Sequence, residues 1–569
     1  MKTKFLGFLK HNNFKLFFAI ILFFSGLLNT YHLEAQNHGG RANWWFFGIT
    51  GTSPNLLTFS MNFNNQNPTS VTTVPVISTF QNLIGYPYTM SDKGGNLLFY
   101  GGQRQIYNRL GAPMLNGDLS YLHLNSSNHY AYPTFSPAMI VLPMPCDPNK
   151  YYLLWTRDSL YYAVIDMSLD NGLGGVIPGQ KGLTVPGVDS LMPVITATKH
   201  NNNIDYWILT RKSPGNEYNA FFLSPSGIDS IPIVSKIGHS TVSSSINMGN
   251  DLVASGKLSF SNSGDKVAFA NNHGSYHDVP QNCLYYNTVP CVDSALFELF
   301  NFDRSSGQMN NYIPLPLDSS FYIWQTTTPG PLYDFGKRGA LMSVEFSPND
   351  DILYCGLQNS LVQYDLTSNN ASIIPGAWSI IDEYPSIILL NDMQVAPNNK
   401  IYTVNPLLLA NNHVMSLGEI ASPNILGIGS NFNSAAISLP QAASFRGLPH
   451  LVPDQLIVRT TATQPTAICA QDTFNLTLND TNFVDSVLWQ LPNEPPKWAH
   501  SPGFGVPHAF AQEGLYPVTG VVYSGCEFDT IFDTLRVHPQ PNAHLGPDTL
   551  LCEGDTFAMN FQDTTFSYL

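Results

Sequence analysis

The stretch "NNHGSYHD", which begins at Asn271, brings together residue types that can bind a metal ion. His273, His277 and Asp278 supply two imidazoles and a carboxylate, which are common ligands of zinc. Two histidines in one loop form a pattern of low specificity, and solvent-exposed loop residues are the simpler interpretation. We therefore predict no resident metal and no other cofactor.

A turn rich in oxygen ligands lies at Asn349, Asp350 and Asp351. Calcium binds carboxylate and carbonyl oxygens, but dedicated calcium loops space their acidic residues regularly, whereas these three residues are adjacent. Asn and Asp side chains also hydrogen-bond the backbone of their own turns. We interpret the three residues as turn-stabilising, with calcium as the alternative.

Aromatic side chains offer a second kind of chemistry, because their faces can stack on sugars or on partner side chains. Tyr285 and Tyr286 lie in the segment "NNHGSYHDVPQNCLYYNTVPC", and Tyr322 and Trp324 lie in "DSSFYIWQTTTPGPLYDFGKRG". Both segments are long and loop-like, and binding residues favour loops that a rigid scaffold positions. These four residues are the candidate ligand contacts. The other aromatic residues are expected to fill cores.

Motifs for catalysis are missing from the sequence. It contains neither His-Glu-x-x-His nor Gly-x-Ser-x-Gly, and "GLGGVIPGQKG" does not have the glycine spacing of a dinucleotide-binding turn. We predict that the protein is not an enzyme.

The scaffold that must position these residues is a repeated β-hairpin. In "LSFSNSGDKVAFA", Leu258 and Phe260 alternate with small or polar residues, as do Val267 and Phe269, and a polar turn with Gly264 separates the two runs. The same pattern recurs around six positions, namely Ser91, Cys146, His200, Ser261, Ser347 and Ala396. Their spacings are 55, 54, 61, 86 and 49 residues, and the two long segments above account for the longest interval.

A second hairpin lies between successive anchors, for example in "YYAVIDMSLDNGLGGV" and "NSLVQYDLTSNNASIIP". Two hairpins make four strands per period, which is the content of one propeller blade, and known blades repeat at roughly 40 to 50 residues. The sequence therefore predicts an all-β fold in which residues 36–452 form a β-propeller of about seven blades. We expect the opening "NWWFFGITGTSPNLLTFS" to complete a blade with the late strands near "SAAISLP".

Charge and composition narrow the class of partner. Only 11% of the residues are charged, and 25 basic against 40 acidic residues give a net charge of −15. Nucleic acids and anionic membranes need clustered Lys and Arg, and no basic run occurs outside the N-terminus. Nucleic acid is therefore excluded as a predicted partner, and an extracellular polysaccharide or protein is expected.

The N-terminus predicts export. Four lysines precede the apolar run "LFFAIILFFSGLL", which is followed by a polar stretch ending in "LEA". The run is shorter than the roughly 20 residues of a membrane span, so we interpret residues 1–35 as a signal peptide rather than an anchor. No later segment is apolar enough to span a membrane, and we expect an extracellular or cell-surface location.

Seven cysteines in an exported chain favour disulfides. Cys283 and Cys291 bracket part of the first long segment and are predicted to form a local bridge. Cys146 and Cys355 follow different repeats, and we assign no bond to them.

After about Pro453 the repeat stops, and short strands with a core tryptophan, Trp489, predict a sandwich of two sheets over residues 453–540. The segments "VLWQLP" and "HAFAQEGLYPVTGVVYSGCEFDT" resemble the tryptophan strand and the Gly-x-Tyr-x-Val segment of the PKD family of immunoglobulin-like domains, although "WQLPNEP" replaces the usual W-x-F-G-D-G. The resemblance implies a disulfide between Cys469 and Cys526. Residues 541–569 parallel the start of this unit, and we expect them to begin a second, incomplete one.

The whole arrangement resembles large exported proteins of Bacteroidetes-type bacteria, in which such arrays end in gliding-motility-associated or type IX secretion sorting domains. That resemblance implies surface display and adhesion. The leading hypothesis is an interaction protein whose propeller is the ligand platform and whose sandwich units are spacers. Two alternatives remain open: a propeller enzyme acting on extracellular polysaccharide, with acidic or histidine side chains converging at the central channel, and a structural component of a surface assembly.

Overall fold

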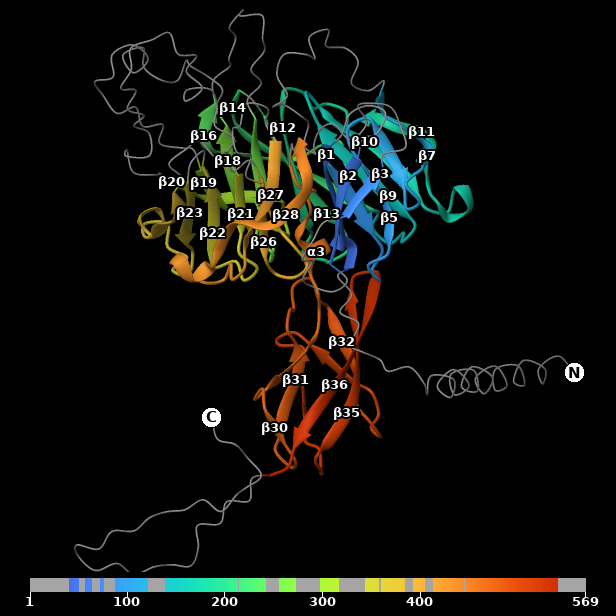
Figure 1. The fold of residues 1–569 in the computed structure, drawn as a ribbon, viewed down its shortest axis with the longest axis vertical. Helices are drawn as coiled ribbons and strands as arrows, with labels where there is room; N and C mark the ends of the chain where they lie inside the picture. The colour runs from blue at the N-terminus through green and yellow to red at the C-terminus, as the bar shows by residue number, and fades with distance from the viewer. Residues whose placement is uncertain are drawn as a thin grey trace, which may run out of the picture.

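The computed structural model describes residues 40–50, 57–63, 72–75, 87–120, 139–212, 214–241, 255–272, 297–316, 343–357, 360–383, 392–404, 413–444 and 447–540. These residues form two bodies, one holding strands β1 to β28 and the other holding β29 to β36 (Figure 1). Almost all of the regular structure is β, with a few single-turn helices. Among the described residues, no helix has the length and apolar character needed to cross a membrane.

Sheets of four or more strands build the larger body, and their pairs are antiparallel except for β7 with β11 in the second sheet. Side chains alternate between the two faces of each strand. The first sheet contains β25 (Asp392–Val395), β26 (Ile401–Val404), β27 (His413–Ile420), β28 (Phe432–Ser444), β1 (Trp44–Thr50), β2 (Leu57–Asn62) and β3 (Thr72–Pro75). The second contains β4 (Tyr88–Ser91), β5 (Leu97–Gly101), β6 (Gln105–Asn108), β7 (Pro113–Asp118), β8 (Met139–Pro143), β9 (Lys150–Thr156), β10 (Leu160–Asp166) and β11 (Gly175–Thr184).

Three further sheets follow in chain order. The third contains β12 (Leu191–Lys199), β13 (Tyr206–Lys212), β14 (Gly215–Ser224), β15 (Gly227–Ile228) and β16 (Ile233–Thr241). The fourth contains β17 (Ser255–Phe260), β18 (Lys266–Asn272), β19 (Phe297–Asp303) and β20 (Gln308–Leu315). The fifth contains β21 (Ser343–Phe346), β22 (Ile352–Gly356), β23 (Ser360–Asp365) and β24 (Trp378–Glu383). Short helical turns are η1 (Gly40–Ala42), η3 (Asp170–Gly172), η6 (Ile374–Gly376) and η7 (Gly427–Ser430).

Both predicted hairpin types are confirmed. The six anchors lie at the hairpins β4–β5, β8–β9, β12–β13, β17–β18, β21–β22 and β25–β26. The second type forms β10–β11, β14–β16, β19–β20 and β23–β24. Polar turn residues such as Asn203 and Asp350 adopt the positive φ that these reversals require.

Apolar side chains fill the spaces between neighbouring sheets. Ile140 and Leu154, from β8 and β9, pack with Ile195 and Ile208, from β12 and β13, and equivalent clusters lie between the other neighbouring sheets. Seven strands contact one another in chain order, namely β1, β4, β8, β12, β17, β21 and β25. Sheets packed side by side in this way form a β-propeller, as the repeats predicted. The number of blades stays a prediction.

The start and the end of the propeller belong to one sheet. Strand β1 meets β28 at Ile49 opposite Ser444, and the buried Trp45 packs in a core cluster with Tyr402 of β26. The expected meeting of the two chain segments therefore occurs, although Ser438 within "SAAISLP" pairs with β27 rather than with β1. Joining the ends removes exposed strand edges.

The smaller body has two sheets around one core. One contains β29 (Thr461–Gln464), β31 (Phe474–Leu478) and β34 (Val506–His508). The other contains β30 (Ile468–Cys469), β36 (Glu527–His538), β35 (Gly514–Ser524), β32 (Ser486–Gln490) and β33 (Lys497–His500). Trp489 is fully buried between the sheets, as its alternation with Val487 predicted, and its Nε1 donates to the carbonyl oxygen of Phe504 at 3.0 Å. We refer to this body as the sandwich.

Candidate functional site

The repeated turns of the propeller gather at one end, and that end faces the sandwich (Figure 1). Turn residues of the propeller make several of the contacts between the two bodies: Lys93 Nζ with Glu527 at 3.1 Å, Cys146 with Cys526 through a disulfide, Asn203 Nδ2 with Asp485 Oδ1 at 2.7 Å, and the Arg304 guanidinium 4.5 Å from the centre of the Phe483 ring. Each propeller residue in this set belongs to a hairpin turn, so local turns rather than core strands make the junction.

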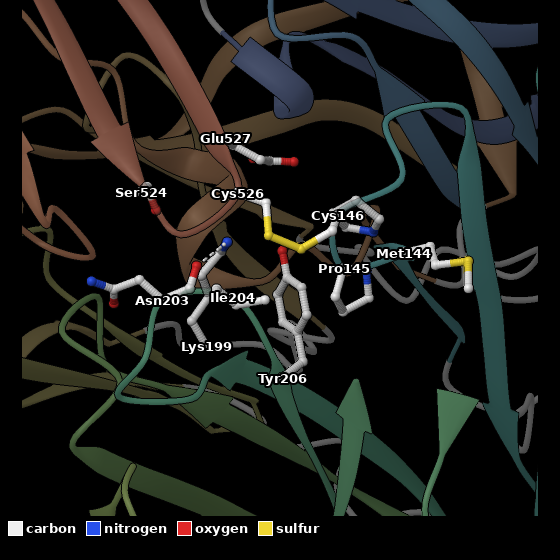
Figure 2. Close-up of a pocket in the computed structure, with 11 residues that line it drawn as sticks. Met144, Pro145, Cys146, Lys199, Asn203, Ile204, Tyr206, Ser524, Cys526 and Glu527 are labelled. Atoms are coloured by element: carbon white, nitrogen blue, oxygen red, sulfur yellow. Dashed lines mark hydrogen bonds between the residues drawn. A yellow bond between two sulfur atoms is a disulfide. The ribbon is translucent and has the colours of Figure 1, made fainter. Parts of the chain in front are cut away.

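A disulfide between Cys146 and Cys526 crosses the junction (Figure 2). The two α-carbons lie 5.2 Å apart, within the range that a disulfide requires. The expected pairing of Cys526 with Cys469 is wrong, and Cys469 is free. The two cysteines lie at opposite ends of β36. Cys526 comes just before Glu527, the first residue of this strand, whereas Cys469 pairs with His538, its last residue. The length of β36 therefore keeps them apart.

The position of Cys146 in a polar hairpin turn is a sequence feature that indicates a surface cysteine. This cysteine lies in the exposed turn between β8 and β9 rather than in a buried strand, and a cysteine at such a position is a candidate for pairing. Cys355, also left unassigned, is fully buried and free. The predicted pair Cys283 and Cys291 lies outside the described residues.

Glu527 is the electrostatic centre of the junction. Its carboxylate accepts two hydrogen bonds from the Arg41 guanidinium, at 2.7 and 3.2 Å, and forms an ion pair with Lys93. Burial by itself would raise the pKa of Glu527, but the charge and hydrogen bonds of Arg41 outweigh it and lower this pKa to about 2. The sandwich is therefore held to the propeller by a bidentate ion pair as well as by a covalent bond.

A cleft beside the disulfide is lined by residues of both bodies. Lys199 is 5% exposed, its Nζ donates to the carbonyl oxygen of Asn203 at 2.9 Å, and burial lowers its pKa. Nearby, the Tyr206 hydroxyl donates to Asp454 Oδ2 at 2.7 Å. The space beside the disulfide is about 210 Å³, and a neighbouring solvent-open cleft lined by Arg41, Lys199 and Asp454 is about 580 Å³. The lining of the larger cleft brings cations together with carboxylates, namely Arg41, Lys93, Lys199 and Arg459 with Asp454, Glu527 and Asp529.

The connector between the bodies crosses the middle of the propeller. Residues 447–460 include the single helical turn α3 (Pro453–Leu456), which contacts both η1 and β12. The backbone N–H of Leu448 donates to Asp392 Oδ2 of β25 at 2.9 Å, and Gln455 Nε2 donates to the carbonyl oxygen of Val141 in β8 at 2.6 Å. The connector therefore ties β25 to β8, two strands that belong to different sheets.

Charged side chains do converge under this connector. Lys257 of β17 lies 2.7 Å from Asp392 Oδ1 and 3.4 Å from Glu345 Oε2 of β21, and all three side chains are at most 12% exposed. Burial raises the pKa of Glu345 to about 7, although Lys257 opposes the shift. Burial also lowers the pKa of His450, on the connector, to about 4.

This cluster bears on the polysaccharide-enzyme hypothesis, which required acidic or histidine side chains to converge at the channel. They converge, but Lys257 lies between the two carboxylates. The backbone N–H of Leu448 donates a hydrogen bond to Asp392, and the backbone N–H of Val395 donates one to Glu345. Such a saturated and buried arrangement ties strands together.

The acidic turn at Asn349 to Asp351 stabilises the scaffold, as predicted. Asp350 accepts the backbone N–H groups of Asn262 and Ser263 at 2.6 and 2.8 Å, which links the turns of two neighbouring sheets. Asp351 accepts the side-chain amide of Asn349 at 2.7 Å. Within the described residues, no group of three or more His, Cys, Asp or Glu side chains could hold a metal ion. His273, His277 and Asp278 lie outside those residues.

The candidate ligand contacts also lie outside the described residues, namely Tyr285, Tyr286, Tyr322 and Trp324. The strands that flank their segments are described. Phe297, the first residue of β19, pairs with Ala270 near the end of β18 and with Leu315 at the end of β20. The turns that face the sandwich lie at the other ends of these three strands. The described strand ends that flank both long segments therefore lie at the end of the propeller away from the sandwich. By contrast, Trp45, Trp155 and Trp207 are buried in the core, as expected.

Comparisons with known proteins agree with the fold and go no further. No protein-family model matches the sequence, and no curated protein matches it. The solved structures that match are β-propeller proteins at low similarity. They include a lectin from Burkholderia pseudomallei (12% identity, 84% of this chain and 100% of that chain covered, TM-score 0.31), a quinoprotein alcohol dehydrogenase-like protein from Bacteroides thetaiotaomicron (9%, 73% and 76%, 0.31) and prolyl oligopeptidase B from Galerina marginata (9%, 64% and 45%, 0.28). Because the TM-scores are this low, the fold assignment depends on the strand pairing of the chain itself.

Proposed function

We propose that this protein is an exported interaction protein, in which a β-propeller of about seven blades presents a ligand-binding end and a sandwich fixes the opposite end. The observation that carries this proposal is the junction. A disulfide and a bidentate ion pair fasten the turn end of the propeller to the sandwich, whereas the two aromatic-rich segments leave the propeller at the other end. A rigid platform with one end held suits display of a binding surface.

The proposal also includes that the protein is exported and that the sandwich is an immunoglobulin-like domain. A disulfide between distant parts of the chain favours an oxidising compartment. Tyr516 supports the immunoglobulin-like class, because its hydroxyl donates to the carbonyl oxygen of Gln512 at 2.9 Å, as a tyrosine corner does. The buried Trp489 on β32 adds to this support. Surface attachment in the manner of the exported proteins that the sequence resembles remains part of the proposal.

The ligand class that we propose is an extracellular polysaccharide or a matrix protein. The test uses the purified chain, incubated with a panel of polysaccharides and matrix proteins, while retention and product release are both recorded. We expect retention without product. Simultaneous replacement of Tyr285, Tyr286, Tyr322 and Trp324 by Ala should weaken retention at least about tenfold, in the range of aromatic hot spots. A control that replaces the exposed Ile231 and Ile428 by Ala should leave it unchanged.

Product release would favour the alternative of an enzyme acting on polysaccharide. The cluster of Glu345, Asp392 and His450 is the group of residues that would then be tested as its site. Glu345→Gln should then abolish release. Absence of both retention and product would favour a purely structural role in a surface assembly.

A further inference from the structure

The five-stranded sheet of the sandwich has an outer face that carries exposed aromatic side chains. Its inner face packs on the core through residues such as Val487, Val518 and Ile531. Because side chains alternate along a strand, the residues between them point outward. Four large apolar residues on this outer face are exposed: Trp498 (53%), Leu515 (69%), Phe528 (63%) and Phe532 (55%).

Three of the rings form a row across the strands. The ring centres of Trp498 on β33 and Tyr523 on β35 lie 5.3 Å apart, and those of Tyr523 and Phe528 on β36 lie 6.2 Å apart. The small residue Ser486 of β32 lies opposite both Tyr523 and His500, so no bulky side chain of β32 interrupts the row at that position. His500 in turn stacks on Trp498 with an interplanar angle of 10°.

The polar residues of this face are nearly uncharged. Small hydroxyl and amide residues lie between the apolar ones, namely Ser486, Gln490, Thr519, Thr530 and Thr534. Arg536, His500 and, at the end of β36, His538 are the basic residues on it, and the outward positions of β32, β33, β35 and β36 include no carboxylate. This is unusual in a chain with 40 acidic residues and a net charge of −15. A face without carboxylates that mixes rings and hydroxyls matches a ligand that is itself uncharged and rich in hydroxyls.

We propose that this face binds a neutral polysaccharide. The C–H faces of uncharged sugar rings can pack on Trp498, Tyr523 and Phe528, while their hydroxyl groups exchange hydrogen bonds with the flanking Thr, Gln and His side chains. Leu488, opposite both Trp498 and Val521, widens the apolar band, and Ser486, Thr519 and Thr530 border it with hydroxyl groups. The sandwich then acts as a second binding site, separate from the propeller end, and not merely as a spacer.

The test uses the full chain with three neutral probes, mixed-linkage β-glucan, xylan and amylose, and the anionic polysaccharide alginate as the contrast. Binding is measured by titration calorimetry for the wild type and for the double variant Trp498→Ala with Phe528→Ala. Both side chains are more than half exposed, so we expect the variant to fold, and circular dichroism and thermal melting verify this. The matched control replaces Ile231 and Ile428, which are 83% and 89% exposed, by Ala.

We expect at least one neutral probe to bind, about tenfold or more weakly in the double variant and unchanged in the control. The proposal is overturned if no neutral probe binds, if alginate binds in preference, or if the double variant binds as the wild type does. Light scattering that shows a dimer broken by Trp498→Ala would also overturn it, because the face would then belong to a second copy of the chain. The variant lacking Tyr285, Tyr286, Tyr322 and Trp324 separates the two proposals, since it should retain this binding even if the propeller site fails.

Discussion

Cys146 and Cys526 are separated by 380 residues in the sequence, yet their α-carbons lie 5.2 Å apart where the propeller meets the sandwich. The bond joins a propeller turn to a sandwich turn, and both turns are exposed. It therefore restrains the relative position of two bodies that have separate cores.

The first prediction concerns this bond. Replacing Cys146 by Ser should lower the free energy of unfolding by about 2–4 kcal/mol, because the unfolded chain is no longer cross-linked. Denaturant titration followed by intrinsic fluorescence measures this loss. Cys469→Ser is the matched control and should change little, since Cys469 is free. Peptide mapping without reduction should recover Cys146 linked to Cys526, and a peptide linking Cys469 to Cys526 would contradict the structure.

The second prediction concerns the pH dependence that Glu527 produces. Its pKa is lowered to about 2 in the folded state, so the stabilisation is present above its unfolded pKa of roughly 4.3 and is lost as the pH falls toward 2. Glu527→Gln should cost about 2–3 kcal/mol at pH 7 and almost nothing at pH 2. Denaturation at both pH values measures the difference. Exposed Glu513 provides the control Glu513→Gln, and an equal cost for Glu527→Gln at both pH values would refute the ion pair.

The third prediction concerns the buried cation between the first strands of the propeller. Lys257→Met leaves Glu345 and Asp392 without their counter-charge in a site that water barely reaches, and should destabilise the protein by about 3–5 kcal/mol. Lys400→Met is the control, because the ion pair of Lys400 with Glu419 is more exposed and should contribute under about 1 kcal/mol. Similar losses for the two variants in thermal and denaturant melts would argue against the buried cluster.

The fourth prediction concerns His450 on the connector. Its pKa is lowered to about 4, so the unfolded chain binds more protons between pH 4 and roughly 6.5, and stability should fall as the pH drops through that window. Part of the side chain reaches solvent, and we therefore expect a modest loss of about 1 kcal/mol between pH 7 and pH 5. His450→Gln should remove that loss. A wild type and variant with the same pH profile would show that another group is responsible.

The candidate site was less predictable than the fold. The hairpin turn at Asp350 was correctly interpreted as turn-stabilising, because the Asx residues act on neighbouring backbone. Glu527, Arg41 and the cluster around Lys257 were not identified from the sequence, since their partners come from distant segments that no local pattern relates. The same holds for the exposed rings of Trp498 and Phe528, which alternate along their strands just as core residues do.

The sequence by itself determined the strands, the hairpins and the two kinds of body, because period-two alternation and polar turns act over a few neighbouring residues. It also placed Trp489 in a core. Only the tertiary structure decided that the repeated turns all face the sandwich and that Cys526 pairs with Cys146 rather than with Cys469. A disulfide needs two α-carbons within a few ångströms, and that proximity is set by how whole sheets pack, which spacing along the chain does not encode.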